Sequence, residues 1–353
     1  MKKPLFICVV LIMIIASAAS LPFVLNAGFG QPPQGEQLTE VEASPQYREG
    51  KFHNTLPTPG YNGDKNMLVA TWDFLIKKTE NARPAQPLPL VKTDLASLPL
   101  EQDTLVWLGH SSWYLQLAGK RILIDPVLSN YAAPFSFLNK AFAGEYPWRA
   151  ESMPEIDLLI ISHDHYDHLD YATIRALLPK VKRVVTPLGV GSHLRYWGMK
   201  PEIIDERDWN QSVRISDELT VHVLPARHFS GRGIKRDRTC GAALCSSRQS
   251  RRFITAGTPA TARTLRPSAS SLMAWMSPSW KRPVRPGLEV HPHAAGGNGA
   301  GLCGSERESV VPGHNGRFVL AKHTWNDPLI QLAKASKDKN YRLLTPALGE
   351  PSG

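Results

Sequence analysis

Residues 156–168 read I-D-L-L-I-I-S-H-D-H-Y-D-H, and this stretch decides how the chain is interpreted. Its first half is a short run of Leu and Ile, which is typical of a buried strand. Its second half places histidines and aspartates in the loop that follows, where a rigid scaffold presents functional groups. Imidazole and carboxylate suit zinc and similar metals, whereas ordinary polar turns use Asn, Gly, Ser and Pro. The stretch therefore predicts a metal site at the end of a strand.

The pattern H-x-H-x-D-H at residues 163–168 is the signature of the metallo-β-lactamase superfamily, and the chain resembles that superfamily in four further motifs. These are V-W-L-G-H-S-S at 106–112, I-L-I-D-P at 122–126, P-A-R-H-F-S-G-R at 225–232 and V-P-G-H-N-G-R-F at 311–318. All four resemble the branch that contains N-acylphosphatidylethanolamine-hydrolysing phospholipase D and bacterial metal-dependent hydrolases. That branch more often has Trp where this chain has Asn315. The resemblance covers about residues 45–238 and 309–350.

The hydrophobic pattern predicts a mixed α/β chain. Strands are expected at 104–108, 114–117, 121–124, 157–161, 181–186 and 218–224, and helices at 66–78, 171–178 and 191–197. The resemblance adds the layering, a four-layer αβ/βα sandwich whose second half we expect to be disrupted. The expected organisation is a signal peptide or membrane anchor at 1–22, a lead-in and family extension at 23–103, and the metallo-β-lactamase-like domain at 104–350.

The N-terminus has the features of an export signal. Lys2 and Lys3 precede an apolar run at residues 5–16, and the A-S-A at 16–18 resembles a signal-peptidase site. Extension of the apolar run through residues 23–25 would instead leave an uncleaved anchor. We therefore expect an exported protein, either periplasmic or otherwise extracytoplasmic, or one that associates with the membrane through its N-terminus.

The formal net charge of +10 over 353 residues raises the question of an anionic partner. Residues 238–308 carry most of that charge, because they hold ten Lys and Arg against three Asp and Glu. Aromatic residues are not interleaved with these cations as they are in single-strand binders. We therefore expect no nucleic-acid partner, and the sequence does not indicate an oligomeric state.

Residues 239–308 are atypical, since they are rich in Ser, Arg, Pro and Ala and show no apolar period. One interpretation is a disordered basic insertion. The other is translation out of frame: shifted by two bases, the codons of 255–264 can encode S-G-D-S-G-Y-G-T-H, and shifted by one base, those of 288–301 can encode W-K-S-I-H-M-L-P-E-E-T-V-Q-A. Both resemble family motifs, in the family's order. Sequencing codons 236–312 in the genome and transcript tests this interpretation, and an intact frame would refute it.

The resemblance implies two metal ions, with zinc as the expected metal. The first is expected to bind His163, His165 and His228, and the second to bind Asp167, His168 and His314. Asp125, Asp167 and His168 are also expected to act in catalysis, and the resemblance implies that Asp125 supports the site by hydrogen bonding to a ligand histidine. Weaker expectations place His110 and His323 in the substrate pocket.

The family's bridging aspartate and a pocket histidine have no counterpart in this chain, because Gly257 and Thr258 stand where the aspartate is expected. We therefore expect one weakly held zinc ion, or two at low occupancy, with little turnover.

By resemblance, the function is hydrolysis of a phosphodiester bond in a small-molecule or lipid substrate, such as an N-acylated phospholipid, by attack of metal-bound hydroxide. Two alternatives stay open: a lactone or amide hydrolase on the same site, and an inactive protein that keeps the scaffold.

Overall fold

The fold is described from a computed structural model. It describes residues 25–55, 79–226, 228–233, 236–248, 251–256, 309–337 and 342–352. The expected export signal at 1–22, the expected helix at 66–78 and the positions Gly257 and Thr258 lie outside these residues.

The larger sheet has seven strands in the order β15-β3-β4-β5-β6-β7-β8. Its strands are β3 (Thr104–Trp107), β4 (Trp113–Leu117), β5 (Lys120–Ile124), β6 (Leu158–Ile160), β7 (Val184–Pro187), β8 (Ile204–Arg207) and β15 (Pro351–Ser352). Pairing is antiparallel from β15 to β5 and parallel from β5 to β8. Strand β6 and the last three residues of β5, Ile122 to Ile124, are apolar and buried, as expected for strands covered on both faces. Because β5 and β6 are parallel, their carboxyl ends lie side by side at the same edge of the larger sheet.

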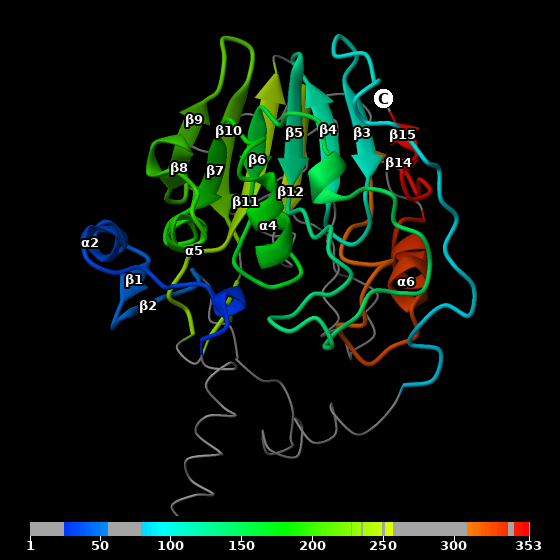
Figure 1. The fold of residues 1–353 in the computed structure, drawn as a ribbon, viewed down its shortest axis with the longest axis horizontal. Coiled ribbons are helices and arrows are strands. Elements are labelled where there is room, and N and C mark those ends of the chain that lie inside the picture. The colour runs from blue at the N-terminus through cyan, green and yellow to red at the C-terminus, as the bar shows by residue number, and fades with distance from the viewer. Residues whose placement is uncertain are drawn as a thin grey trace, which may run out of the picture.

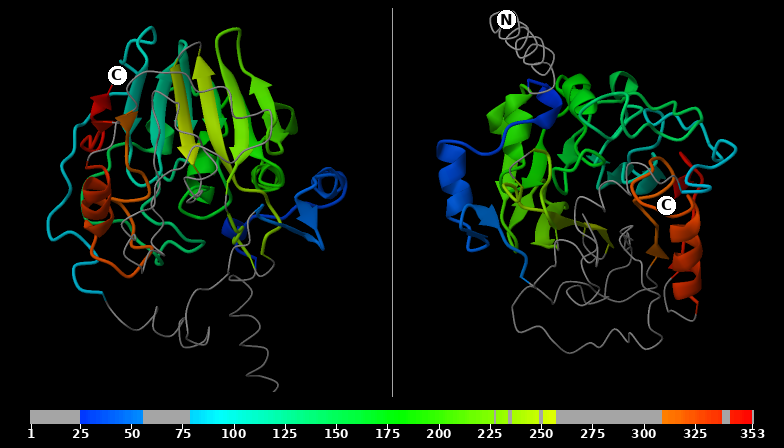
Figure 2. Two further views of the ribbon diagram at one scale, coloured as in Figure 1. Left: turned by 180° about the vertical axis from the view of Figure 1, so that it is seen from behind. Right: turned by 90° about the horizontal axis from the view of Figure 1, so that it is seen from below.

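The second sheet is antiparallel, with the order β12-β11-β10-β9. Its strands are β9 (Ser212–Arg214), β10 (Thr220–Pro225), β11 (Ala242–Arg248) and β12 (Arg251–Ala256). Helices α4 (Tyr171–Leu177) and α5 (Gly191–Tyr196) cover the face of the larger sheet that points away from the second sheet (Figures 1 and 2). The two sheets enclose the main core, which includes Val221 and Leu244 from the second sheet. The result is an α/β sandwich.

The remaining elements lie around this sandwich. They are η1 (Ala27–Phe29), α2 (Glu36–Glu42), β1 (Tyr47–Arg48), β2 (Lys51–Phe52), η2 (Ala150–Ser152), η3 (Pro201–Ile203), β13 (Ser309–Val310), α6 (Asp327–Ala335) and β14 (Arg342–Leu343). Helix α6 lies at the edge of the molecule near β14 and β15 (Figure 1). Among the residues that the structure describes, no helix combines the length and the apolar content needed to cross a membrane.

The interpretation of residues 239–308 as a disordered insertion does not hold for their first part, which forms strands β11 and β12. Strand β11 pairs with β10 from Ala242 to Ser247, and Ala242 to Cys245 are buried. Small residues such as Ala242 and Ala243 leave no alternating pattern, yet they fit where both sides of a strand are covered. Residues 257–308 lie outside the described part of the chain, so the frame interpretation of that part remains a hypothesis.

The packing of β11 predicts how a substitution in this strand changes the stability of the protein. Leu244 pairs with Val223 and is 1% exposed, so replacing it with alanine should leave a cavity. We expect Leu244→Ala to lower the free energy of unfolding by about 2–5 kcal/mol, measured by urea titration. The exposed Ser212→Ala in β9 serves as a control and should stay within about 0.5 kcal/mol of the unmodified chain. Equal stability of the two variants would contradict the placement of β11.

Candidate metal centre

The site forms where the parallel strands β5 and β6 end together. Ile124 pairs with Ile160, and the amide of Asp125 donates to the carbonyl of Ile160 at 2.9 Å. The next residues on each strand, Asp125 and the loop from Ser162 to His168, therefore start side by side. The carboxyl ends of parallel strands are the usual place for a binding site in such sheets.

Asp125 organises this end of the sheet. It is 1% exposed and has φ +42°, a left-handed conformation that non-glycine residues adopt mainly under constraint. Its Oδ1 accepts the amide of Ser162 at 2.7 Å, and its Oδ2 accepts the Ser162 hydroxyl at 2.5 Å and His168 Nδ1–H at 2.9 Å. One carboxylate thus holds both the residue before the first histidine and the last histidine of the motif.

The first cluster consists of His163, His165 and His228, whose candidate ligand atoms lie within 4.8 Å of one another. The Ser162 hydroxyl donates to Asp125, so it accepts His163 Nδ1–H, 2.8 Å away. His165 Nε2–H donates to the carbonyl of Phe229 at 2.7 Å. These bonds leave lone pairs on His163 Nε2 and His165 Nδ1, which face each other at 3.1 Å. Two lone pairs in that position repel each other unless a proton or a metal ion lies between them.

His228 completes this cluster from the second sheet, because it follows β10. Its Nε2 is buried without a hydrogen-bond partner among the described residues. Burial and the nearby His165 lower the pKa of His228 to about 3, so the imidazole is neutral, the form that binds metal. The donor set therefore fits a metal ion: it has three imidazoles, of which His163 and His228 have lowered pKa values, and the buried His228 Nε2 has no hydrogen-bond partner among the described residues.

Two residues that the sequence did not single out fix His228 in place. The side-chain oxygen of Asn54 accepts the His228 amide at 2.8 Å, and its Nδ2 donates to the His228 carbonyl at 2.9 Å. On the other side, a Cβ on Gly241 would lie 2.2 Å from His228 Cγ. His228 therefore packs directly against backbone just before β11, within the segment expected to be atypical.

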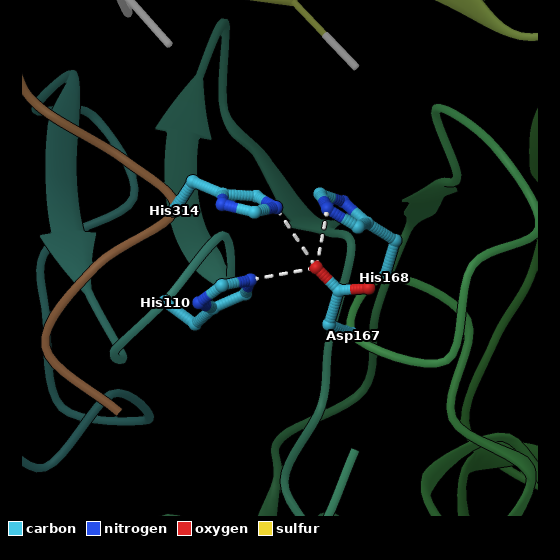
Figure 3. A group of neighbouring side chains, drawn as sticks. All are labelled: His110, Asp167, His168 and His314. Carbon is cyan, nitrogen blue, oxygen red and sulfur yellow. Dashed lines mark hydrogen bonds and ion pairs between the residues drawn. The ribbon is translucent and has the colours of Figure 1, made fainter. Parts of the chain in front are cut away.

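The second cluster converges on a single carboxylate oxygen. Asp167 Oδ2 lies 2.8 Å from His110 Nε2, 3.2 Å from His168 Nε2 and 3.0 Å from His314 Nε2 (Figure 3). Since His168 Nδ1–H donates to Asp125, its Nε2 is the atom available to a metal. Asp167, His168 and His314 together supply the three donors expected for the second metal.

His110 differs from its neighbours in this cluster. It is fully buried, and its Nδ1 has no hydrogen-bond partner within the described residues. An unpaired lone pair there costs less than an unpaired N–H, so the proton belongs on Nε2, which donates to Asp167. Burial and His314 lower the pKa of His110 to about 3, which keeps the ring neutral. His110, which the sequence placed only weakly in the substrate pocket, therefore contacts the carboxylate of Asp167.

A short backbone pairing brings His110 and His314 together. The His110 amide donates to the Asn315 carbonyl at 3.0 Å, and the His314 amide donates to the His110 carbonyl at 3.1 Å. Both histidines have positive φ, 53° and 60°, and their ring centroids are 4.3 Å apart. Asn315 is buried and uses its side chain locally, donating to the Gly313 carbonyl at 2.9 Å.

The two clusters adjoin. The ring centroids of His163 and His168 are 3.9 Å apart, and candidate ligand atoms of Asp125, His163 and His168 also lie within 4.8 Å of one another. His323 does not join either cluster: its Nδ1 contacts the Thr324 carbonyl at 2.7 Å, and the residue lines a small pocket that His314 also lines. The two groups of candidate metal ligands therefore lie side by side.

Comparisons with known proteins agree with this geometry. A model described as the β-lactamase superfamily domain matches residues 120–285. An uncharacterised protein of Mycobacterium tuberculosis is 32% identical over 356 residues, which span 95% of this chain and 92% of that protein. The chain belongs to the β-lactamase superfamily. As a member, it is by family a metal-dependent hydrolase.

Some of the proteins that the chain resembles carry functional names. N-acyl-phosphatidylethanolamine-hydrolyzing phospholipase D 1 of Caenorhabditis elegans is 31% identical over 226 residues, 58% of this chain and 62% of that protein. Among solved structures, the diiron β-hydroxylase CmlA of Streptomyces venezuelae is 18% identical, and the match covers 76% of this chain and 55% of that chain with a TM-score of 0.45.

Arg232 holds the ligand loop of this superfamily site, a role that the sequence did not reveal. The buried guanidinium donates to the carbonyl of Asp164 at 2.9 Å and to that of Gly28 at 2.6 Å, and it lies 4.3 Å over the ring of Tyr166. The hydroxyl of Tyr166 donates back to the Arg232 carbonyl at 2.6 Å. The sequence placed Arg232 in the motif at 225–232, which could have marked it as functional. Its contacts with the ligand loop, however, form only when the chain folds.

The electrostatics predict how metal uptake depends on pH. Burial lowers the pKa of His168, but Asp167 and Asp125 outweigh burial and raise it to about 9. In the metal-free protein at neutral pH, a proton therefore occupies the place that a metal needs, whereas His163, His228 and His314 have lowered pKa values and are neutral. Metal binding at the second cluster should release one proton below pH 9.

We therefore expect the apparent association constant of the second cluster to rise about tenfold per pH unit between pH 6 and 8. Competition with a chromophoric chelator at three pH values measures the slope. The slope is the change in the logarithm of the association constant per pH unit. A slope near zero, or one near three, would contradict the assignment of His168 as the only protonated donor of the second cluster.

Proposed function

We propose that this protein is a zinc-dependent hydrolase with a dinuclear centre that cleaves a phosphodiester bond in a lipid of the N-acylated phospholipid class. The observation that carries the proposal is the pair of adjoining donor clusters, one of three imidazoles and one of Asp167 with His168 and His314. Two adjacent zinc ions would polarise a phosphoryl oxygen and stabilise charge on the attacking and leaving oxygens. The activity named for the Caenorhabditis elegans relative supports the substrate class.

The residues around the donors have separate tasks in this proposal. Asp125 holds His168 directly and His163 through Ser162, which fixes the ring atoms that face the ions. His110 orients Asp167 by donating to its Oδ2. Asp125, Ser162 and His110 need not touch the substrate. Each keeps a metal-binding side chain in the correct protonation state and orientation.

A pocket beside the second cluster favours a substrate with an apolar part. His314 and His323 line it together with Phe142, Phe318, Leu320 and Trp325. The pocket is small, so these aromatic and aliphatic side chains provide an apolar surface next to His314 rather than room for a whole hydrocarbon chain.

The experiment compares zinc-loaded protein on three substrates: an N-acylated phospholipid, a soluble phosphodiester and a lactone. We expect release of an N-acylethanolamine from the first, with the phosphorus left on phosphatidic acid, and weaker turnover of the second. His228→Ala serves as the inactive control, because it removes a donor of the first cluster. Lactone cleavage without phosphodiester cleavage would replace the proposed substrate class, and no cleavage in fully metal-loaded protein would favour the inactive alternative.

Metal analysis distinguishes zinc from iron and also tests the effect of the missing bridging aspartate. We expect zinc, with less than two equivalents per chain retained after gel filtration, because the second ion lacks a carboxylate spacer. Two tightly held equivalents would contradict that expectation, and iron as the retained metal would contradict zinc. Export, with or without an N-terminal anchor, is likewise proposed, and N-terminal sequencing of the protein from its native host tests it.

A further inference from the structure

An apolar tip projects from the loop that connects β5 to η2. Phe137 is 61% exposed and Leu138 is 45% exposed, although large apolar side chains are usually covered. The rings of Phe135 and Phe137 stack with their centroids 5.6 Å apart, so the exposed side chain is supported by a second aromatic ring. We call residues 134–138 the apolar tip.

The apolar tip is joined to the segment where the described part of the chain begins. Asn26 Nδ2 donates to the Pro134 carbonyl at 3.0 Å, and the ring of Phe29 meets that of Phe135 edge-on at 5.9 Å. Leu25, the first described residue, is 68% exposed. The apolar run at residues 5–16 precedes it in the sequence, so that run leads to the chain position tied to this tip.

The same loop leads from the tip to the metal centre. Its far end is held by Arg83, which donates to the carbonyls of Lys140 and Ala141, both at 2.8 Å. The amide of Phe142 then donates to the Arg317 carbonyl at 2.7 Å, and Phe142 lines the pocket beside His314. The apolar tip and Phe142, which lines the pocket beside His314, thus belong to the same loop. This loop begins at Asp125.

We propose that the apolar tip, together with Leu25, is a docking surface for a lipid bilayer. The occupant is a bilayer rather than a protein because the tip is tied to the end of a twelve-residue apolar run, and that run and the tip are most stable in the same apolar phase. Lys140, exposed close to Phe137 and Leu138, matches the mixture of basic and aromatic residues found at membrane interfaces. Docking would present the pocket beside His314 to lipids without their leaving the bilayer.

Hydrogen exchange of the full chain, with and without vesicles of phosphatidylcholine and phosphatidylglycerol, tests the surface directly. Amides of residues 131–142 are expected to become protected at least severalfold when vesicles are added, while those of α6 are unchanged. Unchanged exchange at 131–142 overturns the proposal. Protection that depends on protein concentration rather than on lipid also overturns it, in favour of self-association.

A matched pair of variants tests the side chains. The double variant Phe137→Ser/Leu138→Ser is expected to lose the vesicle-induced protection and to bind vesicles on the order of tenfold more weakly in flotation. The control Ile330→Ser removes a 42% exposed side chain from α6 and should behave like the unmodified chain. Equal binding by the double variant overturns the proposal, as does equal weakening by the control. Neither readout requires hydrolysis, so failure of the proposed activity would be seen separately; unchanged metal content in the double variant shows that it is folded.

Discussion

Replacing Asp125 by asparagine is expected to remove metal from both clusters although Asp125 itself need not bind an ion. The amide that replaces Oδ2 would present N–H groups to His168 Nδ1 and to the Ser162 hydroxyl, where the carboxylate now accepts two bonds. His168 would then carry its proton on Nε2, and His163 would lose the hydrogen bond that fixes its tautomer. We expect metal affinity to fall by about 10–100-fold at each cluster.

The measurement is metal content and competitive titration of the variant. Asp170→Asn is the matched control, because Asp170 is equally buried and accepts bonds from Thr173 at the start of α4 instead of from a ligand histidine. The control should lose stability but keep its metal. If Asp125→Asn retains metal as well as Asp170→Asn does, Asp125 does not organise the site.

Replacing Gly241 by alanine is the second prediction with a large effect. The new Cβ would lie 2.2 Å from His228 Cγ and 2.5 Å from its Cβ, so the ring must move. A displacement of that size should lower the metal affinity of the first cluster by about tenfold or more, without changing any donor. The second cluster, which does not use His228, should keep its affinity.

Cobalt substitution provides the readout, since the visible spectrum of Co²⁺ responds to the ligands of each cluster. Gly233→Ala is the control, because no atom lies within 4 Å of a Cβ at that position. An unchanged first-cluster spectrum in Gly241→Ala would mean that the chain just before β11 does not pack against His228 as described.

The sequence was sufficient for the parts of the site that are local in the chain. The strand expected at 157–161 is β6, Leu158–Ile160, and the helix expected at 171–178 is α4, Tyr171–Leu177. Both follow from short-range patterns, an apolar run in one case and an amphipathic turn capped by Asp170 in the other. The family and the α/β class follow from the same stretch, and the comparisons confirm them.

The parts that the sequence did not reveal depend on contacts between distant segments. His110 meets Asp167 only because residues 110 and 315 pair across the fold, and Asn54 meets His228 from a loop near the N-terminal end. Strand β11 was missed because Ala242 and Ala243 are apolar but small, so burial on both sides leaves no alternation. Such features become visible only once the two sheets are placed face to face.

The first cluster draws its donors from both sheets, and this has a thermodynamic consequence. His163 and His165 follow β6 in the larger sheet, whereas His228 follows β10 in the smaller one, and the amide of Ala242 also donates to Ser162 across the gap at 3.1 Å. A bound ion is therefore a cross-link between the halves of the sandwich. At a free metal concentration about a thousand times its dissociation constant, it would add about 4 kcal/mol to the free energy of unfolding. Removing the ion with a chelator should therefore lower the stability of the whole fold. The ion would have a structural role as well as a catalytic one.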